Sequence, residues 1–397
     1  MRKFSAQFIF TGDGTVLEKG IISVNNDGVI TEVINTGGNL SEMSSLEFYN
    51  GVIVPGFVNA HCHLELSHLR GVFPEKTKLP QFLQYVFLHR SSQDENIVGA
   101  AKEADIEMWN NGISAVGDIS NNNLTLGIKA ASKIYYHTFM ESLGFSPDRA
   151  ERAFQWSLNC LKEARSFGLS ASVVPHAPYS ISKDLFDKIS ELAENEEAIL
   201  SIHNQESPDE DDLYKFGTGK IVRHLSENLL LDLSFFTPSG ISALSTVLGW
   251  LPSQNNLLLV HNICTIDEDI EMIGEVRAFD KTWFVLCPNS NLYIEDRLPD
   301  INLFWKNQLR LCLGTDSLSS NKNLSILSEM KTIQKYFPDI PLEEIVIWAT
   351  RNGAEALGIQ EWAGTIEKGK RPGINLISGL DLHKLQLLPQ SKVKRLI

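Results

Sequence analysis

The segment VIVPGFVNAHCH, residues 52–63, joins a run of apolar residues to two histidines. Such a run is typical of a strand that is buried on both faces. His61 and His63 are two positions apart, so an extended strand places both imidazoles on one side and Cys62 on the other. The segment therefore predicts a buried strand ending in two inward-facing imidazoles, which are ligands that divalent transition metals favour. Cys62 is predicted to pack in the wall behind them.

Seven further apolar runs follow, and most are separated by stretches with the 3.6-residue spacing of helices. The runs cover residues 113–116, 134–139, 171–174, 199–202, 257–260, 283–286 and 311–313. The helical stretches cover residues 95–111, 148–167, 182–196, 240–251, 266–278, 324–336 and 341–357. Eight strands that alternate with helices predict an α/β fold, specifically a parallel (β/α)8 TIM-like barrel.

Both ends of the chain carry short β patterns. Residues 8–10, 21–24 and 29–30 surround turns rich in glycine and asparagine, and residues 364–366 and 374–377 form a second small pattern. Because neither group of strands can form a stable core alone, we expect them to pack together as one small β-sandwich domain. The predicted limits are residues 1–55 and 362–397 for this small domain and residues 56–361 for the barrel.

Polar or ionisable residues follow every predicted strand of the barrel, and five of the ten histidines lie there. Active sites of such barrels form at the carboxyl ends of the strands, so we expect these side chains to share one site. In chain order they are His61 with His63, Asp118, Glu141, His176, His203 with Glu206, His261, Asn289 and Asp316.

A metal centre is the first expectation for this site. His203 supplies a third imidazole, and Asp316, at the mouth of an apolar strand, is costly unless it is paired, hydrogen-bonded or bound to a metal. His61, His63, His203 and Asp316 are therefore the predicted ligands of one ion, with one position open for a water whose pKa falls to about 7. A two-metal version would carry a carboxylated lysine on the fourth strand, and no lysine occurs between residues 170 and 182.

The remaining polar residues are assigned catalytic or substrate-binding roles. Glu206 is the predicted general acid and base, and its alternative is a solvated carboxylate beside the acidic residues 209–212. His261 is predicted to orient the attacking hydroxide, with Asp316 assisting, and its alternative is an ordinary core histidine. The predicted substrate contacts are His176, Glu65, Asn289 and Ser317. For each of them, the alternative is a residue that only supports the fold. Glu141 is a weaker candidate of the same kind.

Composition narrows the class of partner and the compartment. The 397 residues carry a formal net charge of −14, which disfavours nucleic acid and anionic membranes as partners. No apolar run approaches the roughly 20 residues needed to span a bilayer. The five scattered cysteines fit reduced thiols, so we expect a cytoplasmic protein.

Taken together, these residues resemble the amidohydrolase superfamily, in its chlorohydrolase/deaminase branch, which includes S-adenosylhomocysteine, guanine and aminodeoxyfutalosine deaminases and triazine hydrolases. The matching motifs are residues 55–64, PHAPY at 175–179, H-x-x-E at 203–206, CPNSN at 287–291, GTDS at 314–317, NGA at 352–354 and GTIEKGK at 364–370. Relatives usually continue with Ala-Asp where this chain has Arg371-Pro372-Gly373.

The resemblance implies one Zn²⁺ or Fe²⁺ held by the four predicted ligands, with Glu206 as proton shuttle and His261 as orienting residue. It also allows a homodimer. The leading hypothesis is hydrolytic deamination of a small N-heterocycle, purine- or nucleoside-like, with release of ammonia. The alternatives are a chlorohydrolase-type reaction, a cyclic-amide hydrolase on the same barrel, or a two-metal imidase. A silent binding protein is disfavoured because the predicted site is complete.

Overall fold

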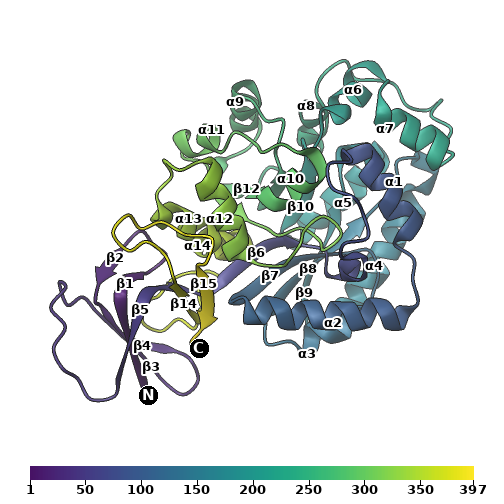
Figure 1. Cartoon of the computed structure of the whole chain (residues 1–397). Helices are drawn as coiled ribbons and strands as arrows, with labels where there is room; N and C mark the ends of the chain where they lie inside the picture. Colours follow the sequence, from purple (N-terminus) through teal and green to yellow (C-terminus); the bar gives the residue numbers. More distant parts are fainter.

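Eight parallel strands form the centre of the molecule, and the computed structural model describes all residues from 1 to 397. They lie in two four-stranded sheets, ordered β6-β7-β8-β9 and β10-β11-β12-β13 (Figure 1). Their bounds are β6 (Phe57–Cys62), β7 (Ile113–Ser120), β8 (Tyr135–Ser142), β9 (Ser170–Pro175), β10 (Leu200–Asn204), β11 (Leu257–His261), β12 (Thr282–Leu286) and β13 (Leu311–Leu313). Each predicted apolar run contributes to one of these strands, and all six neighbouring pairs are parallel.

The first predicted run, residues 52–59, is divided between two sheets. β5 (Leu46–Pro55) belongs to a separate sheet, and β6 begins at Phe57 after the single residue Gly56. A Cβ atom at position 56 would lie 2.0 Å from Ser114 Oγ and 2.4 Å from the carbonyl oxygen of Pro372, so a residue without Cβ is needed there. The chain therefore passes from one sheet to the other within one residue.

The two four-stranded sheets are linked by hydrogen bonds at both edges. Between β9 and β10, the His203 amide donates to the His176 carbonyl at 2.9 Å. Between β6 and the end of β13, Asn59 Nδ2 donates to Thr315 Oγ1 at 2.7 Å, and the Thr315 amide donates to Asn59 Oδ1 at 3.0 Å. This strand order is the one expected of a (β/α)8 arrangement.

Helices surround these sheets, and those predicted from spacing are present. They are α2 (Asp94–Asn110), α4 (Ala150–Ser166), α5 (Lys183–Glu196), α8 (Ala243–Val247), α9 (Asp267–Val276), α12 (Ile326–Tyr336), α13 (Leu342–Ala349) and α14 (Arg351–Ala356). The stretch predicted as one helix over 341–357 is divided because Thr350 leaves the helical conformation, with ψ at −86°. The helices that periodicity did not indicate are α1 (Leu79–His89), α3 (Leu126–Ala131), α6 (Pro208–Phe216), α7 (Lys220–Arg223), α10 (Pro288–Glu295) and α11 (Ile301–Lys306).

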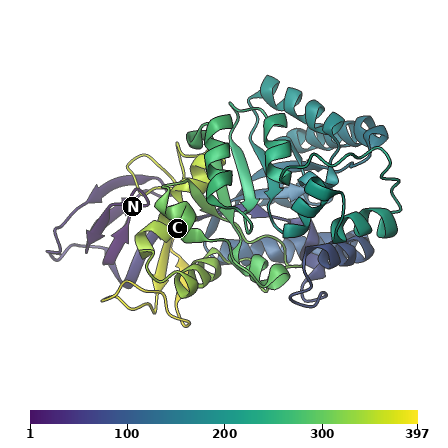
Figure 2. The same cartoon turned by 90° about the horizontal axis from the view of Figure 1, so that it is seen from above.

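Segments from both ends of the chain pair in one seven-stranded sheet. Its order is β15-β14-β5-β1-β3-β4, with β2 beside β1. The bounds are β1 (Arg2–Phe10), β2 (Val16–Glu18), β3 (Ile21–Val24), β4 (Ile30–Ile34), β14 (Ile374–Ser378) and β15 (Lys392–Arg395). Residues 364–366 form an irregular bend rather than a strand, and Gly364 there adopts a φ of +85°. Figure 2 shows the sheet at one side of the molecule.

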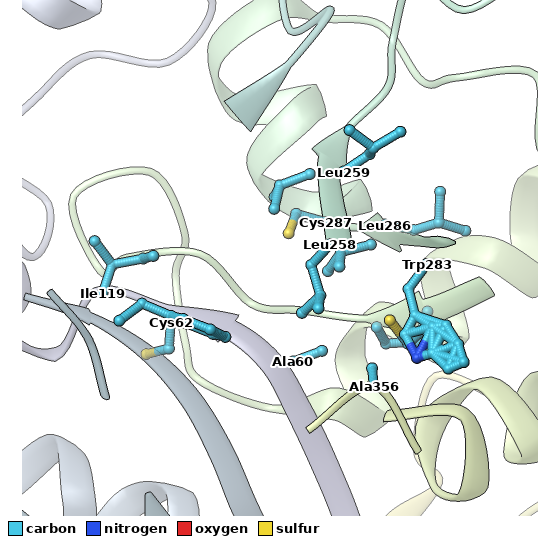
Figure 3. Packing of buried hydrophobic residues seen from close by; sticks show 14 of the residues in the cluster. Ala60, Cys62, Ile119, Leu258, Leu259, Trp283, Leu286, Cys287 and Ala356 are labelled. Carbon is cyan, nitrogen blue, oxygen red and sulfur yellow. The ribbon is translucent and has the colours of Figure 1, made fainter. Parts of the chain in front are cut away.

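The main core lies between the parallel strands and their helices. It contains 88 buried apolar residues, whereas the terminal sheet encloses a separate core of 12, so most of the hydrophobic stabilisation comes from the central region. Cys62 is fully buried in this core, which confirms its predicted packing role. Figure 3 shows Cys62 among other buried residues of this core, Ala60 and Ile119 included. All five cysteines are unpaired. None of the helices combines the length and the apolar character needed to cross a membrane.

His137, near the start of β8, is expected to make the fold sensitive to acid. Its ring nitrogens lie 2.9 Å from Ser170 Oγ and 3.0 Å from Ser172 Oγ, and burial lowers its pKa to about 4. The folded state therefore binds this proton only at a lower pH than the unfolded state does. The contribution of neutral His137 to the free energy of unfolding is complete above the ordinary pKa of about 6.5 and is lost as the pH falls towards 4. Between pH 7 and pH 5, protonation linked to His137 should lower the free energy of unfolding by about 2 kcal/mol.

The measurement is urea unfolding at pH 7 and pH 5 for the wild type and for His137→Gln. We expect the variant to lose about 2 kcal/mol less than the wild type over this interval. His383→Gln serves as the control, because His383 is exposed on the far terminal segment. Equal losses in the wild type and in His137→Gln would contradict the assignment.

Candidate active site

The four predicted metal ligands converge at the carboxyl ends of β6, β10 and β13. His63 Nε2 lies 3.1 Å from His61 Nε2 and 3.3 Å from His203 Nε2. Asp316 Oδ1 lies 3.5 Å from His63 Nε2 and 3.8 Å from His61 Nε2. All four side chains are buried, and three separate stretches of the chain supply them.

This cluster has the dimensions and the chemistry of a zinc site. Four ligands at about 2.1 Å around a tetrahedral ion are separated by about 3.4 Å, which matches the measured spacings. The facing Nε2 atoms have each other as their nearest polar neighbours, an arrangement that is unfavourable without a shared cation. Burial lowers the pKa of His61 and His203 well below the ordinary value, so both rings are neutral and can offer lone pairs.

Neighbouring groups fix the orientation of these ligands. His203 Nδ1 donates to the carbonyl oxygen of His176 at 2.8 Å, which leaves Nε2 as the ligand atom. Asp316 Oδ2 accepts from Ser290 Oγ at 2.6 Å and from Ser320 Oγ at 2.7 Å, so Oδ1 is turned towards the histidines. Asp316 has a φ of +56°, a left-handed conformation that is rare outside glycine and is often found at functional sites.

Glu206 and His261 lie together beside the cluster. Glu206 Oε1 is 3.7 Å from His261 Nε2, and His261 Nδ1 is 2.8 Å from its acceptor, Asn291 Oδ1. Glu210 Oε1 accepts from the Glu206 amide at 2.8 Å, which fixes the turn into α6. Glu206 is only 4% exposed, so it is not the solvated loop carboxylate that the acidic segment 209–212 suggested as an alternative. Burial, followed by the charge of Asp316, raises the pKa of Glu206 well above its ordinary value.

A cavity of about 470 Å³ opens onto this cluster, a size that suits a small organic molecule. Its inner end is lined by His63, His203, Asp316, Glu206 and His261. The rest of its lining is largely apolar and comes mainly from α1 and residues 225–231, together with Leu66, Leu143 and Phe145. The site therefore combines a cluster of metal-ligating atoms, a buried carboxyl group and an apolar chamber.

A sequence profile of the amidohydrolase family matches residues 52–396, which is most of the chain. The chain belongs to the amidohydrolase family. The matched region contains every strand of the two parallel sheets and all four converging ligands, so the resemblance inferred from the motifs is confirmed.

Individual relatives of this amidohydrolase are deaminases. The adenosine deaminase of Helicobacter pylori is 28% identical over 334 residues, covering 83% of this chain and 79% of the relative. Among solved structures, the aminofutalosine deaminase of the same organism in complex with methylthio-coformycin has a TM-score of 0.83 at 23% identity, covering both chains fully. The adenosine deaminase of Xanthomonas campestris with bound zinc has a TM-score of 0.72 at 22% identity, covering 98% of this chain and 87% of that one.

The predicted substrate contacts of this amidohydrolase divide into two groups. His176 and Ser317 line the cavity. Glu65 and Asn289 are not among the lining residues: Glu65 Oε2 accepts from the Asn121 amide at 3.1 Å, and Asn289 Nδ2 donates to Glu329 Oε1 at 2.8 Å. Both therefore lie behind the cavity wall, where they hold neighbouring segments.

Other lining residues of the amidohydrolase were not anticipated. Arg90 follows the end of α1, Asn121 follows β7, and Phe82 and Leu225 supply apolar surface. Three of these residues, Arg90, Phe82 and Leu225, belong to segments far from any predicted strand end. Asn121 lies three residues beyond Asp118. The sequence pattern indicated site residues only at the strand ends themselves, so it could not indicate these four. Ser290 was detectable in principle, since it lies inside the CPNSN motif, yet the motif does not reveal that its hydroxyl holds Asp316.

Proposed function

We propose that this amidohydrolase binds one divalent ion, Zn²⁺ first and Fe²⁺ as the alternative, through His61, His63, His203 and Asp316. Support comes from the tetrahedral spacing of their ligand atoms and from the zinc present in the Xanthomonas campestris relative. When bound, such an ion supplies an activated water at neutral pH. No lysine is available on β9 to bridge a second ion, which favours a single-metal site.

We propose hydrolytic deamination of an amino-substituted N-heterocycle, with an adenine nucleoside as the first candidate. The observation that supports it most is the buried Glu206 beside His261 at the inner end of the cavity. Burial raises the pKa of Glu206 well above its ordinary value, which favours the protonated form that can give its proton to the ring nitrogen next to the amine-bearing carbon. That protonation makes the carbon electrophilic, so that water can add to it.

The remaining proton movements also fall to residues of the cavity. His261, neutral because burial lowers its pKa, orients the attacking water through Nε2. Glu206, with Asp316 assisting, receives the proton lost by water and passes it to the amine. The C–N bond then breaks, and the products are the carbonyl form of the heterocycle and ammonia. His176 and Ser317 are proposed to contact the substrate directly, and Glu65 and Asn289 to act through the segments they hold.

We also infer that residues 56–361 close into one (β/α)8 barrel and that residues 1–55 and 362–397 fold as a small β-sandwich domain. The strand order and the hydrogen bonds at both sheet edges support the barrel. The separate 12-residue core supports the small domain. The deaminase relatives support a small-molecule N-heterocyclic substrate. A cytoplasmic location, a homodimer and the absence of nucleic acid partners stay predictions.

Ammonia release tests the function and its metal dependence together. Zinc-loaded protein should release ammonia from adenine nucleosides and should lose at least 99% of this activity, a loss of about 10²-fold or more, after exhaustive chelation. Returning one equivalent of Zn²⁺ should restore it. Guanine, cytosine and pterin complete the panel.

Two further arms separate the alternatives. Chloride release from a chlorinated triazine would favour the chlorohydrolase, and two tightly bound metal equivalents with opening of a cyclic imide would favour the imidase. Activity that survives chelation unchanged would refute the metal-dependent mechanism.

A further inference from the structure

Glu141, near the end of β8, has a carboxylate oxygen that no protein group uses. Its side chain is buried and lines the cavity. Oε2 accepts a hydrogen bond from Asn121 Nδ2 at 2.7 Å, whereas Oε1 is buried without any partner. A buried acceptor without a partner costs free energy, so its retention at the wall of a substrate cavity calls for a donor that arrives with the ligand.

The carboxylate of Glu141 is held in place by residues from three other segments. Asn121 Oδ1 accepts from Arg90 Nη2 at 2.8 Å, and the backbone N–H of Asn121 donates to Glu65 Oε2 at 3.1 Å. Arg90 Nη2 also lies 3.5 Å from Glu65 Oε1. Asn121 is thus fixed on both sides, so Glu141 has one oxygen anchored and one oxygen directed away from the anchor.

The nearest histidine does not serve as the partner of Oε1. Glu141 Oε1 lies 3.7 Å from His203 Nδ1, but this nitrogen already donates to the His176 carbonyl at 2.8 Å. Nδ1 is also on the side of the imidazole away from Nε2, the atom that faces the other ligands. The free oxygen of Glu141 therefore lies on the Nδ1 side of the His203 ring, away from Nε2, in a residue that lines the cavity.

We propose that Glu141 determines specificity by accepting hydrogen bonds from the sugar hydroxyls of a nucleoside substrate. This inference rests on the proposed function. An adenine nucleoside has donors only at its amino group and its hydroxyls, and its ring nitrogens are acceptors. The amino group must lie at Glu206 for the reaction, so the hydroxyls are the donors left for a carboxylate oxygen elsewhere in the cavity.

The Glu141→Gln variant provides a sharp test because of the anchor at Asn121. Asn121 Nδ2 donates, so the amide oxygen of the new side chain must take the place of Oε2. The amide NH₂ group then takes the place of Oε1, and an acceptor in the cavity becomes a donor. The change keeps the size of the side chain and replaces only the group that meets the hydroxyls.

The experiment compares adenosine with 2′,3′-dideoxyadenosine on zinc-loaded enzyme. We expect the wild type to prefer adenosine by about 10- to 100-fold in kcat/KM, the range typical of hydrogen bonds to a charged group. In Glu141→Gln this preference should fall below about threefold, through loss of activity on adenosine and unchanged activity on the dideoxy compound. The matched control is Glu163→Gln, because Glu163 is exposed on α4 and contacts Asn123 outside the cavity.

Each outcome separates this inference from the proposed function. If the wild type releases ammonia equally from both nucleosides, the role of Glu141 is refuted and the deaminase function stands. If Glu141→Gln loses activity on both substrates equally, or loses its metal, Glu141 is a structural residue and the proposal is wrong. If the wild type acts on no adenine nucleoside but deaminates another heterocycle of the panel, the role of Glu141 is refuted and the deaminase function stands. If it releases ammonia from no compound of the panel, both proposals are overturned. The wild-type comparison decides even where the variant fails to fold.

Discussion

Replacing Glu206 by glutamine is expected to lower kcat by about 10²- to 10⁴-fold, the usual contribution of a general acid and base, while one equivalent of metal stays bound. Glutamine keeps the shape of the side chain but cannot give up a proton to the substrate ring. Because Glu206 Oε1 is 3.7 Å from His261 Nε2 and is not within the set of four ligand atoms, the metal should be unaffected. Steady-state ammonia release and metal analysis on the same sample measure both effects.

The control for this variant is Asp209→Asn, on the neighbouring acidic segment. Asp209 is a half-buried residue in the first turn of α6 and lies outside the cavity lining. We expect Asp209→Asn to leave kcat within about twofold, because this carboxylate does not reach the cavity in which the proton transfer takes place. Near-normal turnover by Glu206→Gln with its metal in place would refute the proposed proton transfer.

The second large effect concerns stability and involves the ion pair between Lys129 and Asp118. Both side chains are fully buried, and Lys129 Nζ lies 2.5 Å from Asp118 Oδ2. Lys129→Met removes one charge and leaves the other buried without compensation, which typically costs 3–5 kcal/mol, so we expect the free energy of unfolding to fall by about 4 kcal/mol. Urea unfolding followed by tryptophan fluorescence gives this value.

A double variant distinguishes the buried charge from simple loss of packing. Asp118→Asn combined with Lys129→Met removes both charges, so it should recover at least about 1 kcal/mol relative to Lys129→Met alone. Asn at position 118 can still accept from the Leu64 amide, which Asp118 Oδ1 does at 2.8 Å. A double variant that is less stable than Lys129→Met would show that the ion pair is not the source of the effect.

The strand ends account for most of what the sequence made predictable. His61, His63, His203 and Asp316 follow apolar runs, and parallel strands bring their carboxyl ends to one edge, so the pattern itself implies that they meet. Cys62 was placed correctly for the same reason, because alternate residues of a strand face opposite sides.

The outer part of the site was not predictable in this way. The apolar wall comes from α1 and residues 225–231, whose positions depend on tertiary contacts rather than on local periodicity. Glu65 illustrates the difficulty: it lies two residues after a ligand, yet it turns behind the wall to hold Asn121. A side chain in a turn has no period of two or 3.6 residues from which its direction could be inferred.

The pair of hydrogen bonds between Asn59 and Thr315 has a consequence for how the protein matures. These residues are 256 positions apart in the chain, and each is adjacent or nearly adjacent to a ligand, His61 or Asp316. A newly made polypeptide therefore cannot assemble the complete ion site until synthesis has passed Asp316 and the loop between Asn59 and Thr315 has closed, a slow entropic step. Uptake of the ion should follow folding rather than guide it.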